Sequence, residues 1–379
     1  MRASIVDEPG ALEPYVDAWS ELAADGGRPM CLPAWMLAWW RHARPERAAL
    51  RVVLVHDSGG LAGVAPYFAH SGRAGRVDFR LLASGTSHRI GPVCRPGREA
   101  EVGRAVARAL AQARPSLVSF EGVDAASAFP AAVAAGWPGP VRPRRYHAAT
   151  VGTPVLDLTG DFETWLQSRS ANFRQQMRQS ERRLAAAGGR IRLMTASEDV
   201  ERAVAAFATL HVARWAGRGG TALDPEAAAR MLLDAARTLV PAAQLRLWCA
   251  EVEDRVACVQ VFVAAGGELS YWNGGWAPEY ARCRPALGTI LAAVRDAFGR
   301  DEQRVDFGGG EDPYKLRFAG PPGPETVTWE GLFPVHARYP LTRVQLAPSQ
   351  LGWAARRAVR RLPPRRREQL RRVLRGTPE

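Results

Sequence analysis

The chain has 379 residues, of which 47% are hydrophobic and 23% charged; this composition excludes global disorder and allows two or three domains. The formal net charge is +13, but residues 353–375 hold ten arginines and one glutamate, so this segment carries +9 and the rest carries 13 − 9 = +4. Strongly basic character is therefore a property of the C-terminal tail and not of the folded body.

No stretch of 18 apolar residues occurs, and the first residues hold no apolar run long enough for a signal peptide. These observations predict a cytoplasmic protein. Five cysteines occur without a CxxC pair, a pattern that predicts small apolar filler rather than a disulfide framework or a zinc site. The sequence therefore predicts no bound metal.

In the first half, hydrophobic periodicity and turn residues predict helices and strands in mixed order. The expected elements are helices over 11–24 and 33–43, strands near 50–56, 61–69 and 77–83, a helix over 97–114, a strand over 116–121, a helix over 125–135 and a strand near 146–151.

The second half gives a similar order of elements. They are helices over 161–187, with a break near Ser168–Ser170, 197–216 and 224–239, strands over 244–251, 255–264 and 268–274, a helix over 286–299, and strands over 303–307 and 325–333. Helices, a meander of strands, and then a helix with further strands indicate a mixed α/β fold in each half.

An internal repeat supports two like domains. Residues 50–68 and 245–263 align without a gap at an offset of 195, and each consists of a strand, a turn and a second strand, which is typical of a hairpin. Gly152, Pro154 and Gly160 punctuate the chain between the halves. The expected divisions are an N-terminal domain over 1–152, a C-terminal domain over 153–345 and an arginine-rich tail over 346–379.

The strongest local signal for function is the segment 271–294. An aromatic strand with Tyr271 and Asn273 ends in two glycines, a loop with Arg284 follows, and a proline opens an apolar helix. The unpaired N–H groups and positive dipole end of a helix N-terminus suit a pyrophosphate, and Gly288 would let a phosphate approach the backbone closely. The competing interpretation is an ordinary strand–loop–helix connection.

The second signal is the sequence VDFGGGEDPYKLRF at 305–318. Asp306 ends a short strand, three glycines force an irregular turn, and Glu311, Asp312, Tyr314 and Lys315 follow. Lys315 is the chain's single lysine among 51 basic residues. Carboxylates beside a lysine on a glycine loop form a candidate acid/base or substrate-positioning cluster, and a solvated turn with a surface ion pair is the alternative.

Two helical segments contain further candidates. Arg174 and Arg178 lie four residues apart on one helix face, where they would meet a phosphate or carboxylate unless that face is simply solvated. His211 and Trp215 have the same spacing, and a packed histidine is the commoner outcome for such a pair. In the first half, Trp35 is expected in a core stripe rather than in the wall of a substrate cleft.

These residues, in this order, resemble the CelD/BcsL-type acyltransferases, which are relatives of the Fem peptidoglycan-modifying transferases within the GNAT superfamily. The segments that carry the resemblance are Trp165, Phe173-Arg174 with Arg178, Leu210-His211 with Arg214-Trp215, Pro285 to Gly288, Asp306 to Gly308, and Glu311 with Tyr314-Lys315. The resemblance covers about residues 1–335. It implies an α/β protein of two tandem GNAT-like domains with mixed, mostly antiparallel central sheets, in agreement with the repeat.

The resemblance also implies an acyl-CoA donor, acetyl-CoA or a longer acyl-CoA, bound by the second domain. The thioester would lie beside the strand at 269–274, and the pyrophosphate would lie at the helix start. The donor-binding residues implied are Tyr271, Asn273, Arg284, Gly288 and Thr289.

The reaction implied is direct transfer of the acyl group to an amine or hydroxyl of a small molecule, a polysaccharide or a cell-envelope precursor. Asp306 or Glu311 would be the base or the amine-positioning group, and Lys315 would stabilise negative charge. The residues expected to bind substrate are Arg174, Arg178, His211, Trp215 and Tyr314.

Two alternatives remain open. The loop departs from the strict GNAT pattern Q/R-x-x-G-x-G/A, since residues 282–288 read RCRPALG, and this leaves an aminoacyl-tRNA donor with a peptidoglycan precursor as acceptor, as in the Fem relatives. A non-catalytic binding protein that keeps the fold is the second alternative. The arginine-rich tail suits an anionic membrane surface, a partner or nucleic acid, and would place the protein at the inner membrane face.

Overall fold

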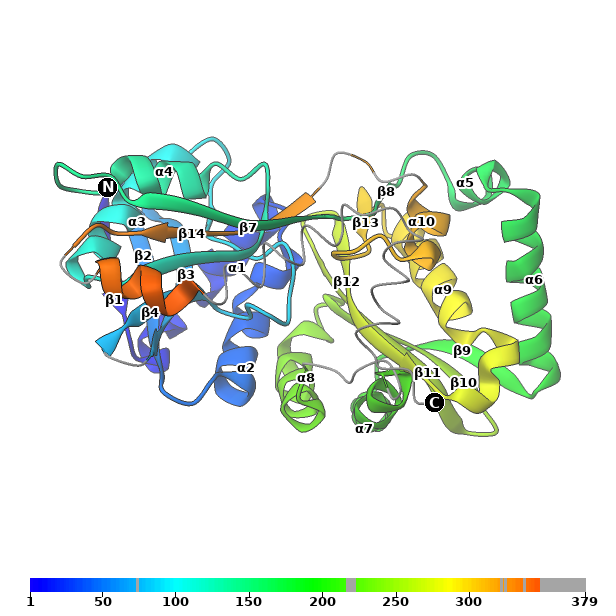
Figure 1. The fold of residues 1–379 in the computed structure, drawn as a ribbon. Helices are drawn as coiled ribbons and strands as arrows, with labels where there is room; N and C mark the ends of the chain where they lie inside the picture. Colours follow the sequence, from blue (N-terminus) through cyan, green and yellow to red (C-terminus); the bar gives the residue numbers. More distant parts are fainter. Residues whose placement is uncertain (73–74, 216–222, 321–322, 324–325, 337–338, 348–379) are drawn as a thin grey trace, which may run out of the picture.

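The computed structural model describes residues 1–72, 75–215, 223–320, 323, 326–336 and 339–347, without the side chain of Trp215. The predicted arginine-rich tail lies outside the described residues from residue 348 onward. Two β-sheets lie side by side, and helices flank each of them (Figure 1).

The first sheet has eight strands in the order β1-β2-β3-β4-β6-β14-β7, and β5 pairs with β3. These strands are β1 Arg2–Val6, β2 Ala48–Asp57, β3 Gly60–Ser71, β4 Val77–Leu81, β5 Val93–Cys94, β6 Leu117–Asp124, β7 Arg144–Gly152 and β14 Thr326–Phe333. The helices of this half are α1 Val16–Asp25, α2 Pro33–Ala43, α3 Glu99–Gln112 and α4 Phe129–Gly136.

The second sheet has six strands in the order β8-β13-β12-β11-β10-β9. These strands are β8 Val155–Asp157, β9 Gly189–Met194, β10 Leu245–Val252, β11 Arg255–Ala265, β12 Glu268–Trp276 and β13 Arg304–Asp306. The helices are α5 Phe162–Ser168, α6 Ala171–Ala186, α7 Ser197–Trp215, α8 Pro225–Leu239, α9 Pro285–Gly299 and α10 Pro313–Ala319, with a 3-10 helix η4 at Pro278–Cys283.

The two halves repeat one arrangement. The predicted hairpins are β2–β3 and β10–β11, and each is followed by a strand, a helix and a strand that returns parallel to the first. The helix is α3 between the parallel strands β4 and β6, and α9 between β12 and β13. The other strand pairs in the described sheets are antiparallel. The predicted α/β fold with mixed, mostly antiparallel sheets is therefore confirmed.

Helix boundaries follow local capping and proline. The break predicted near Ser168–Ser170 is present between α5 and α6, and Ser170 Oγ caps α6 by accepting a hydrogen bond from Phe173 N at 3.2 Å. The predicted helix over 11–24 was wrong at its start, where the chain forms a 3-10 helix at Pro9–Tyr15 and α1 begins only at Val16. Pro14 lacks an N–H and so interrupts an α-helical ladder there.

The sequence analysis missed four strands: β1, β8 and β9, which each lie at an edge of their sheet, and the two-residue strand β5, which pairs with β3. An edge strand has one partner and keeps polar side chains, so its apolar pattern is weak. In β9, for example, Arg190 and Arg192 alternate with apolar residues, and both pair with Glu251 of β10 at 3.0 Å. Charge pairing across the edge replaces the apolar face that prediction relies on.

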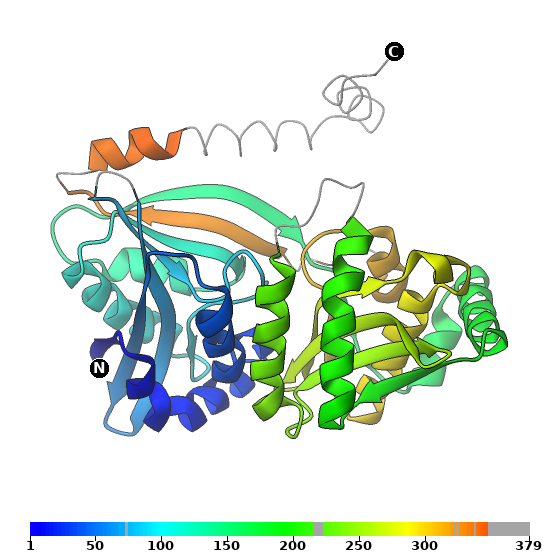
Figure 2. The same ribbon diagram turned by 90° about the horizontal axis from the view of Figure 1, so that it is seen from below.

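Strand β14 was predicted within the second domain but hydrogen-bonds in the first sheet, between β6 and β7. A helix over 339–347 follows it and lies beside β7 and β14 (Figure 2). The division at residue 152 stays a prediction, but residues 326–347 pack with the first half. The chain therefore crosses between the halves twice, once on leaving β7 and once on returning to β14.

The halves share an apolar core. Helix α2 packs against α8 (Figure 1). Trp35 of α2 is fully buried and meets Trp272 of β12 edge-on at 5.1 Å between ring centroids. Trp35 Nε1 also donates to Ser87 Oγ at 3.1 Å. The core position predicted for Trp35 is confirmed. Among the described helices, none is both long and apolar enough to cross a membrane.

We expect Gly266→Ala to destabilise the contact between the halves. Gly266 has φ +58°, and an added Cβ would lie 1.8 Å from the carbonyl oxygen of Ala24 in α1. Overpacking of this kind costs about 1–3 kcal/mol or more, so the Tm should fall by several degrees. Gly188→Ala is the matched control, because Gly188 has φ +68° and open space around it. Equal Tm losses in the two variants would show that backbone strain, not the contact, is responsible.

Candidate active site

A pocket of about 390 Å³ opens where β12 and β13 separate. The two strands pair over three residues, up to Ser270 opposite Asp306, and β12 then continues without β13, paired with β11, to Trp276. The pocket is lined by residues of α7, β11, β12, η4, α9 and the start of α10, namely Arg214, Gln260, Tyr271, Trp276, Ala281, Arg284, Pro285, Ala286, Leu287, Ile290, Asp312, Pro313 and Tyr314. The pocket lies beside β12, the strand next to which the sequence analysis expected the thioester of the donor.

One end of the pocket is the start of α9. Arg284 is the N-cap residue, has φ 49° and ψ 50°, and lines the pocket. Helix α6 holds the backbone of this loop, since Ser180 Oγ donates to Cys283 O at 2.6 Å and Arg183 Nη1 donates to Arg282 O at 3.1 Å. A guanidinium at a helix N-terminus is suited to a phosphate.

The other end of the pocket is a cluster of two tyrosines and an arginine. Arg214 Nη1 donates to Gly274 O at 3.0 Å and lies 3.5 Å from the hydroxyl of Tyr271; it also hydrogen-bonds to the hydroxyl of Tyr314. Burial raises the pKa of Tyr271 and of Tyr314, so both hydroxyls keep their protons at neutral pH. The cluster therefore presents hydrogen-bond donors to a developing negative charge.

A β-bulge aims Tyr271 into this cluster. The β11–β12 register shifts between Val261 and Phe262 and skips Trp272, so Tyr271 packs in the apolar cluster with Phe262 while Trp272 packs on the opposite side with α7 and the first half. Asn273 follows the bulge, and its Oδ1 accepts a hydrogen bond from Gly274 N at 3.0 Å.

Two other residues predicted to bind the donor pack away from the pocket. An added Cβ on Gly288 would lie 2.9 Å from Ile191 Cδ1, so this glycine faces the packing between α9 and its neighbours. Thr289 is fully buried, and its hydroxyl donates to Pro285 O at 2.9 Å. Donor roles for Gly288, Thr289 and Asn273 stay predictions, whereas Arg284 and Tyr271 line the pocket.

Lys315 supports the glycine loop after β13. It is 5% exposed, its Nζ donates to Gly309 O at 2.8 Å and to Gly308 O at 3.3 Å, and Asp312 Oδ2 lies 3.7 Å away. Burial lowers the pKa of Lys315. A buried ammonium that binds two carbonyls fixes the loop that connects β13 to α10, and α10 carries Tyr314 into the pocket.

The two carboxylates predicted as base have different settings. Asp306 is 2% exposed, accepts from Gly308 N at 2.7 Å and pairs with Arg89 of the first half at 3.2 Å. Glu311 is exposed and lies against Gly152. Asp312, which the sequence analysis noted in this segment but gave no role, lines the pocket beside Tyr314. The signal for Asp312 was present in its position between Glu311 and Tyr314.

Burial, and next the charge of Glu268, raise the pKa of Asp306 from 3.8 to about 6. The folded state therefore holds this proton to higher pH than the unfolded state, and stability falls as the pH rises from about 4 to about 6. We expect the Tm of Asp306→Asn, relative to wild type, to rise across that interval. Thermal melts from pH 4 to 8 test this, with Asp157→Asn on the neighbouring strand as an exposed control. A difference in Tm that does not change with pH would contradict it.

Of the remaining predicted substrate residues, Arg174 and His211 lie in structural contacts. Arg174 Nη1 donates to Gln167 O at 2.7 Å and to Arg169 O, at the break between α5 and α6, and Arg178 is exposed. His211 is 1% exposed and stacks on Phe207 at 5.4 Å; burial lowers its pKa. The Trp215 side chain lies outside the described residues. Substrate roles for these four residues stay predictions.

Arg214 was part of the sequence resemblance but was given no role, and the structure places it at the centre of the tyrosine cluster. Helix α7 crosses β12 very closely here, since an added Cβ on Gly275 would lie 2.5 Å from the backbone of Leu210. The adjacent Gly274-Gly275 pair was the available signal, because glycine in a strand interior marks a close backbone approach.

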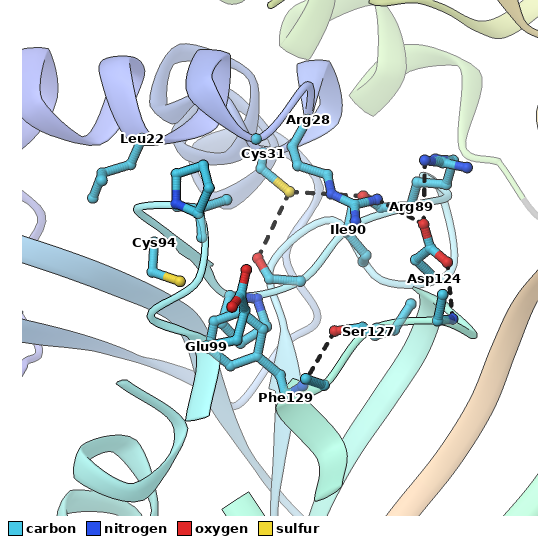
Figure 3. Close-up of a pocket in the computed structure, with 18 of the residues that line it drawn as sticks. Leu22, Arg28, Cys31, Arg89, Ile90, Cys94, Glu99, Asp124, Ser127 and Phe129 are labelled. Atoms are coloured by element: carbon cyan, nitrogen blue, oxygen red, sulfur yellow. Dashed lines mark hydrogen bonds and ion pairs between the residues drawn. The ribbon is translucent and has the colours of Figure 1, made fainter. Parts of the chain in front are cut away.

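The first half has a pocket of about 410 Å³ in the corresponding position, between the end of β6 and the start of α3 (Figure 3). The N-cap residue of its helix is also an arginine, but Arg98 pairs with Asp57 at 3.4 Å and with Glu101 at 2.8 Å, and Glu99 of the first turn lines the pocket. On the opposite side, Arg28 and Arg89 both pair with Asp124, at 3.0 and 3.2 Å. Acidic residues in a first helical turn disfavour a phosphate, so the duplicated pockets differ in charge.

The chain was compared with known proteins. Residues 171–316 match a protein-family model described as an acetyltransferase (GNAT) domain. A search of curated proteins gave no significant match. Three solved structures are similar over most of the chain, each at 10% identity.

The first is FemX, with a TM-score of 0.62, covering 91% of this chain and 99% of FemX. The second is the C-terminal domain of a putative lysylphosphatidylglycerol synthetase from Agrobacterium fabrum, with a TM-score of 0.52, covering 84% of this chain and 91% of that one. The third is a conserved protein of unknown function from Bacteroides thetaiotaomicron, with a TM-score of 0.51, covering 87% and 99%. The predicted tandem architecture is confirmed, membership of the CelD/BcsL-type family stays a prediction, and residues 171–316 in the second half match a GNAT acetyltransferase domain.

Proposed function

We propose that this protein transfers an acyl group, with acetyl the first candidate, from acyl-CoA to an amine or hydroxyl of an acceptor. The observation that carries the proposal is the pocket between the separated strands β12 and β13, with Arg284 at one end and the Tyr271–Arg214–Tyr314 cluster at the other. The match of residues 171–316 to a GNAT domain supports acyl transfer as the reaction class.

The donor would lie along the pocket with its phosphates at the start of α9. Arg284 and the positive end of the helix favour the pyrophosphate, and the apolar side chains of Leu287 and Ile290 line the path between the two ends. The thioester would then lie against Tyr271 on β12. This orientation follows the polarity of the pocket, with a cationic loop at one end and neutral hydroxyls at the other.

The reaction would be a direct transfer. The acceptor nitrogen or oxygen attacks the thioester carbonyl carbon, a C–N or C–O bond forms, and the C–S bond breaks. Arg214 stabilises the charge on the carbonyl oxygen in the transition state. Asp312 takes the proton that the acceptor loses, and Tyr314 gives its own proton to the departing sulfur and is then reprotonated, so that free CoA leaves as a thiol.

Asp312 is preferred here to Asp306 and Glu311 as the base because it lines the pocket, whereas Asp306 is paired with Arg89 inside the fold. Lys315 is proposed to act through the loop it holds. The function is tested by measuring thiol release from acetyl-CoA and from a longer acyl-CoA, with and without amine and hydroxyl acceptors. Release that depends on an acceptor supports the proposal, and no release from either donor overturns it.

Lys315→Met should lower kcat by about 100-fold, because a displacement of catalytic groups by about 1 Å has effects of this size. The variant leaves Gly308 O and Gly309 O without their buried donor, which costs about 1–3 kcal/mol of stability. Arg317→Met is the control, since Arg317 is on the same short helix and exposed. Full turnover by Lys315→Met would remove Lys315 from the mechanism.

An aminoacyl-tRNA donor, with a peptidoglycan precursor as acceptor, is the second candidate. The observation that favours it is Pro285 at the first position of α9, because proline has no N–H to offer a pyrophosphate. A non-catalytic binding role remains the third. Location at the inner membrane face and binding of an anionic surface or nucleic acid rest on the tail beyond residue 347, and retention on anionic vesicles or RNA after truncation there separates those roles from catalysis.

A further inference from the structure

The first sheet has a separate pocket, of about 470 Å³, on the face turned away from its apolar core. On β4, Phe79 is buried in the core, and Asp78 and Arg80 on either side of it line the pocket. On β6, Ser119 and Glu121 alternate with core residues in the same way. The two-residue period of neighbouring strands therefore presents four polar side chains on one surface.

The charged groups of this pocket are paired. Arg76 Nη2 lies 2.9 Å from Asp78 Oδ2, and Arg80 Nη2 lies 2.5 Å from Glu121 Oε2. Ser119 Oγ donates to the other oxygen of Glu121 at 3.0 Å. Glu330, which also lines the pocket, pairs with Arg145 at 2.9 Å, so each carboxylate has a guanidinium partner and the pairs offer planar donors and acceptors in alternation. A pocket of this kind has no preference for an anion or a cation.

Several of these polar atoms have unused hydrogen-bonding capacity. Asp78 is 5% exposed, and its Oδ1 is buried without a partner in the part of the chain that the structure describes. The same holds for Nε of Arg76 and Nε of Arg80. A buried polar atom without a partner costs about 1–3 kcal/mol of stability. Burial raises the pKa of Asp78, as expected for a carboxyl in this setting.

Aromatic side chains lie on the other side of the same pocket. Tyr146 of β7 and Trp329 and Phe333 of β14 line it, and the Tyr146 and Phe333 rings are 6.3 Å apart. Aromatic faces pack against flat apolar surfaces, and the C–H faces of a sugar ring are such surfaces. Neutral paired charges on one wall and aromatic rings on the other match a ring with hydroxyls at its edge and C–H groups on its faces.

We propose that this pocket binds a saccharide, and that the saccharide carries the acceptor group of the reaction. Its role as acceptor rests on the proposed function, whereas its binding does not. The pocket connects to the second half through Trp329, whose ring meets that of His88 edge-on at 5.9 Å. His88 lies against Gly309, whose carbonyl oxygen accepts from Lys315. The wall of the pocket is therefore in packing contact, through Trp329 and His88, with the loop that leads to Tyr314.

The test is ligand-observed NMR titration of the full chain, without donor, with glucose, N-acetylglucosamine and a β-linked disaccharide of each. Asp78→Asn and Glu121→Gln keep side-chain size and should raise the Kd at least tenfold. Asp254→Asn, on a turn with a side chain 89% exposed, should leave the Kd unchanged. Tyr146→Ala, at a half-buried position, tests the aromatic wall separately, and thermal melts establish that each variant is folded.

Saccharide binding that the three pocket variants weaken and the control keeps would support the inference. Absence of binding by wild type, binding that the pocket variants do not affect, or tighter binding of inorganic phosphate or glycine than of any saccharide would overturn it. The titration with acyl-CoA is a separate experiment. Saccharide binding without acyl-CoA binding would contradict only the proposed function. Acyl-CoA binding without saccharide binding would contradict only this inference.

Discussion

Arg284→Gln should weaken acyl-CoA binding by roughly 10- to 100-fold. A hydrogen bond to a charged group contributes about 1.5–3 kcal/mol, and 1.4 kcal/mol is a factor of ten in Kd. Arg284 is the residue that brings a positive charge to the start of α9 in this pocket, and α6 holds its backbone in place. Isothermal titration with acetyl-CoA and with a longer acyl-CoA measures the effect.

The matched control is Arg300→Gln, the same change at the opposite end of the same helix. Arg300 is the C-cap residue of α9 and pairs with Asp296 at 2.9 Å on the surface. It should leave the Kd for acyl-CoA within about twofold, since surface pairs contribute about 0–1 kcal/mol to stability and this one lies outside the pocket. Gly288→Glu is a poorer test, because it would collide with Ile191 before it reached a phosphate. If Arg284→Gln binds acyl-CoA as tightly as wild type, the phosphates of the donor do not bind at Arg284, and the aminoacyl-tRNA donor is favoured.

Tyr314→Phe should lower kcat by about 100- to 10,000-fold, the usual range for loss of a general acid, and should leave the Kd for the donor nearly unchanged. Burial, followed by the neighbouring Tyr271, keeps the pKa of the Tyr314 hydroxyl high, so it is protonated and able to donate to the leaving sulfur. Single-turnover measurements with acyl-CoA and an acceptor separate the chemical step from binding.

Tyr280→Phe is the control for this change, since Tyr280 lies on η4, next to the pocket residue Ala281, but does not itself line the pocket. A shared loss in both variants would indicate damage to packing. If Tyr314→Phe instead raises only the KM, Tyr314 binds substrate without donating a proton, and Tyr271 becomes the remaining hydroxyl beside Arg214.

The pocket at the start of α9 and the corresponding pocket of the first half together predict that each chain binds one donor molecule. Both helices have an arginine as the N-cap residue, but Arg98 of α3 is paired with Asp57 and Glu101 and Glu99 lines that pocket, whereas Arg284 of α9 lines its own. A negative charge at that point opposes a pyrophosphate that Arg284 would attract. Titration with acyl-CoA should therefore give about one bound donor per chain. The N-terminal half of the duplicated fold would then serve a purpose other than donor binding.

The elements of the fold were largely predictable because their signals are local. The hairpins β2–β3 and β10–β11 were found from apolar strands around a turn, and the break between α5 and α6 from the residues near Ser170. The edge strands were missed because charge pairing replaces an apolar pattern there. Strand β14 was found, but its sheet was not, since its partners β6 and β7 are far away in sequence and no local pattern encodes that choice.

For the site, the sequence determined which residue types were available, and the tertiary structure decided which of them meet. Tyr271, Arg284 and Tyr314 were predicted and line one pocket, because each belongs to a segment whose polar or aromatic residues interrupt an apolar pattern. Asn273 and Thr289 were equally plausible in sequence, but a bulge in β12 and the packing of α9 turn them to other partners. Side-chain direction depends on register, bulges and helix rotation, which only long-range packing fixes. For the same reason Arg214, Asp312 and the paired charges around Asp78 were visible as residues but not as sites.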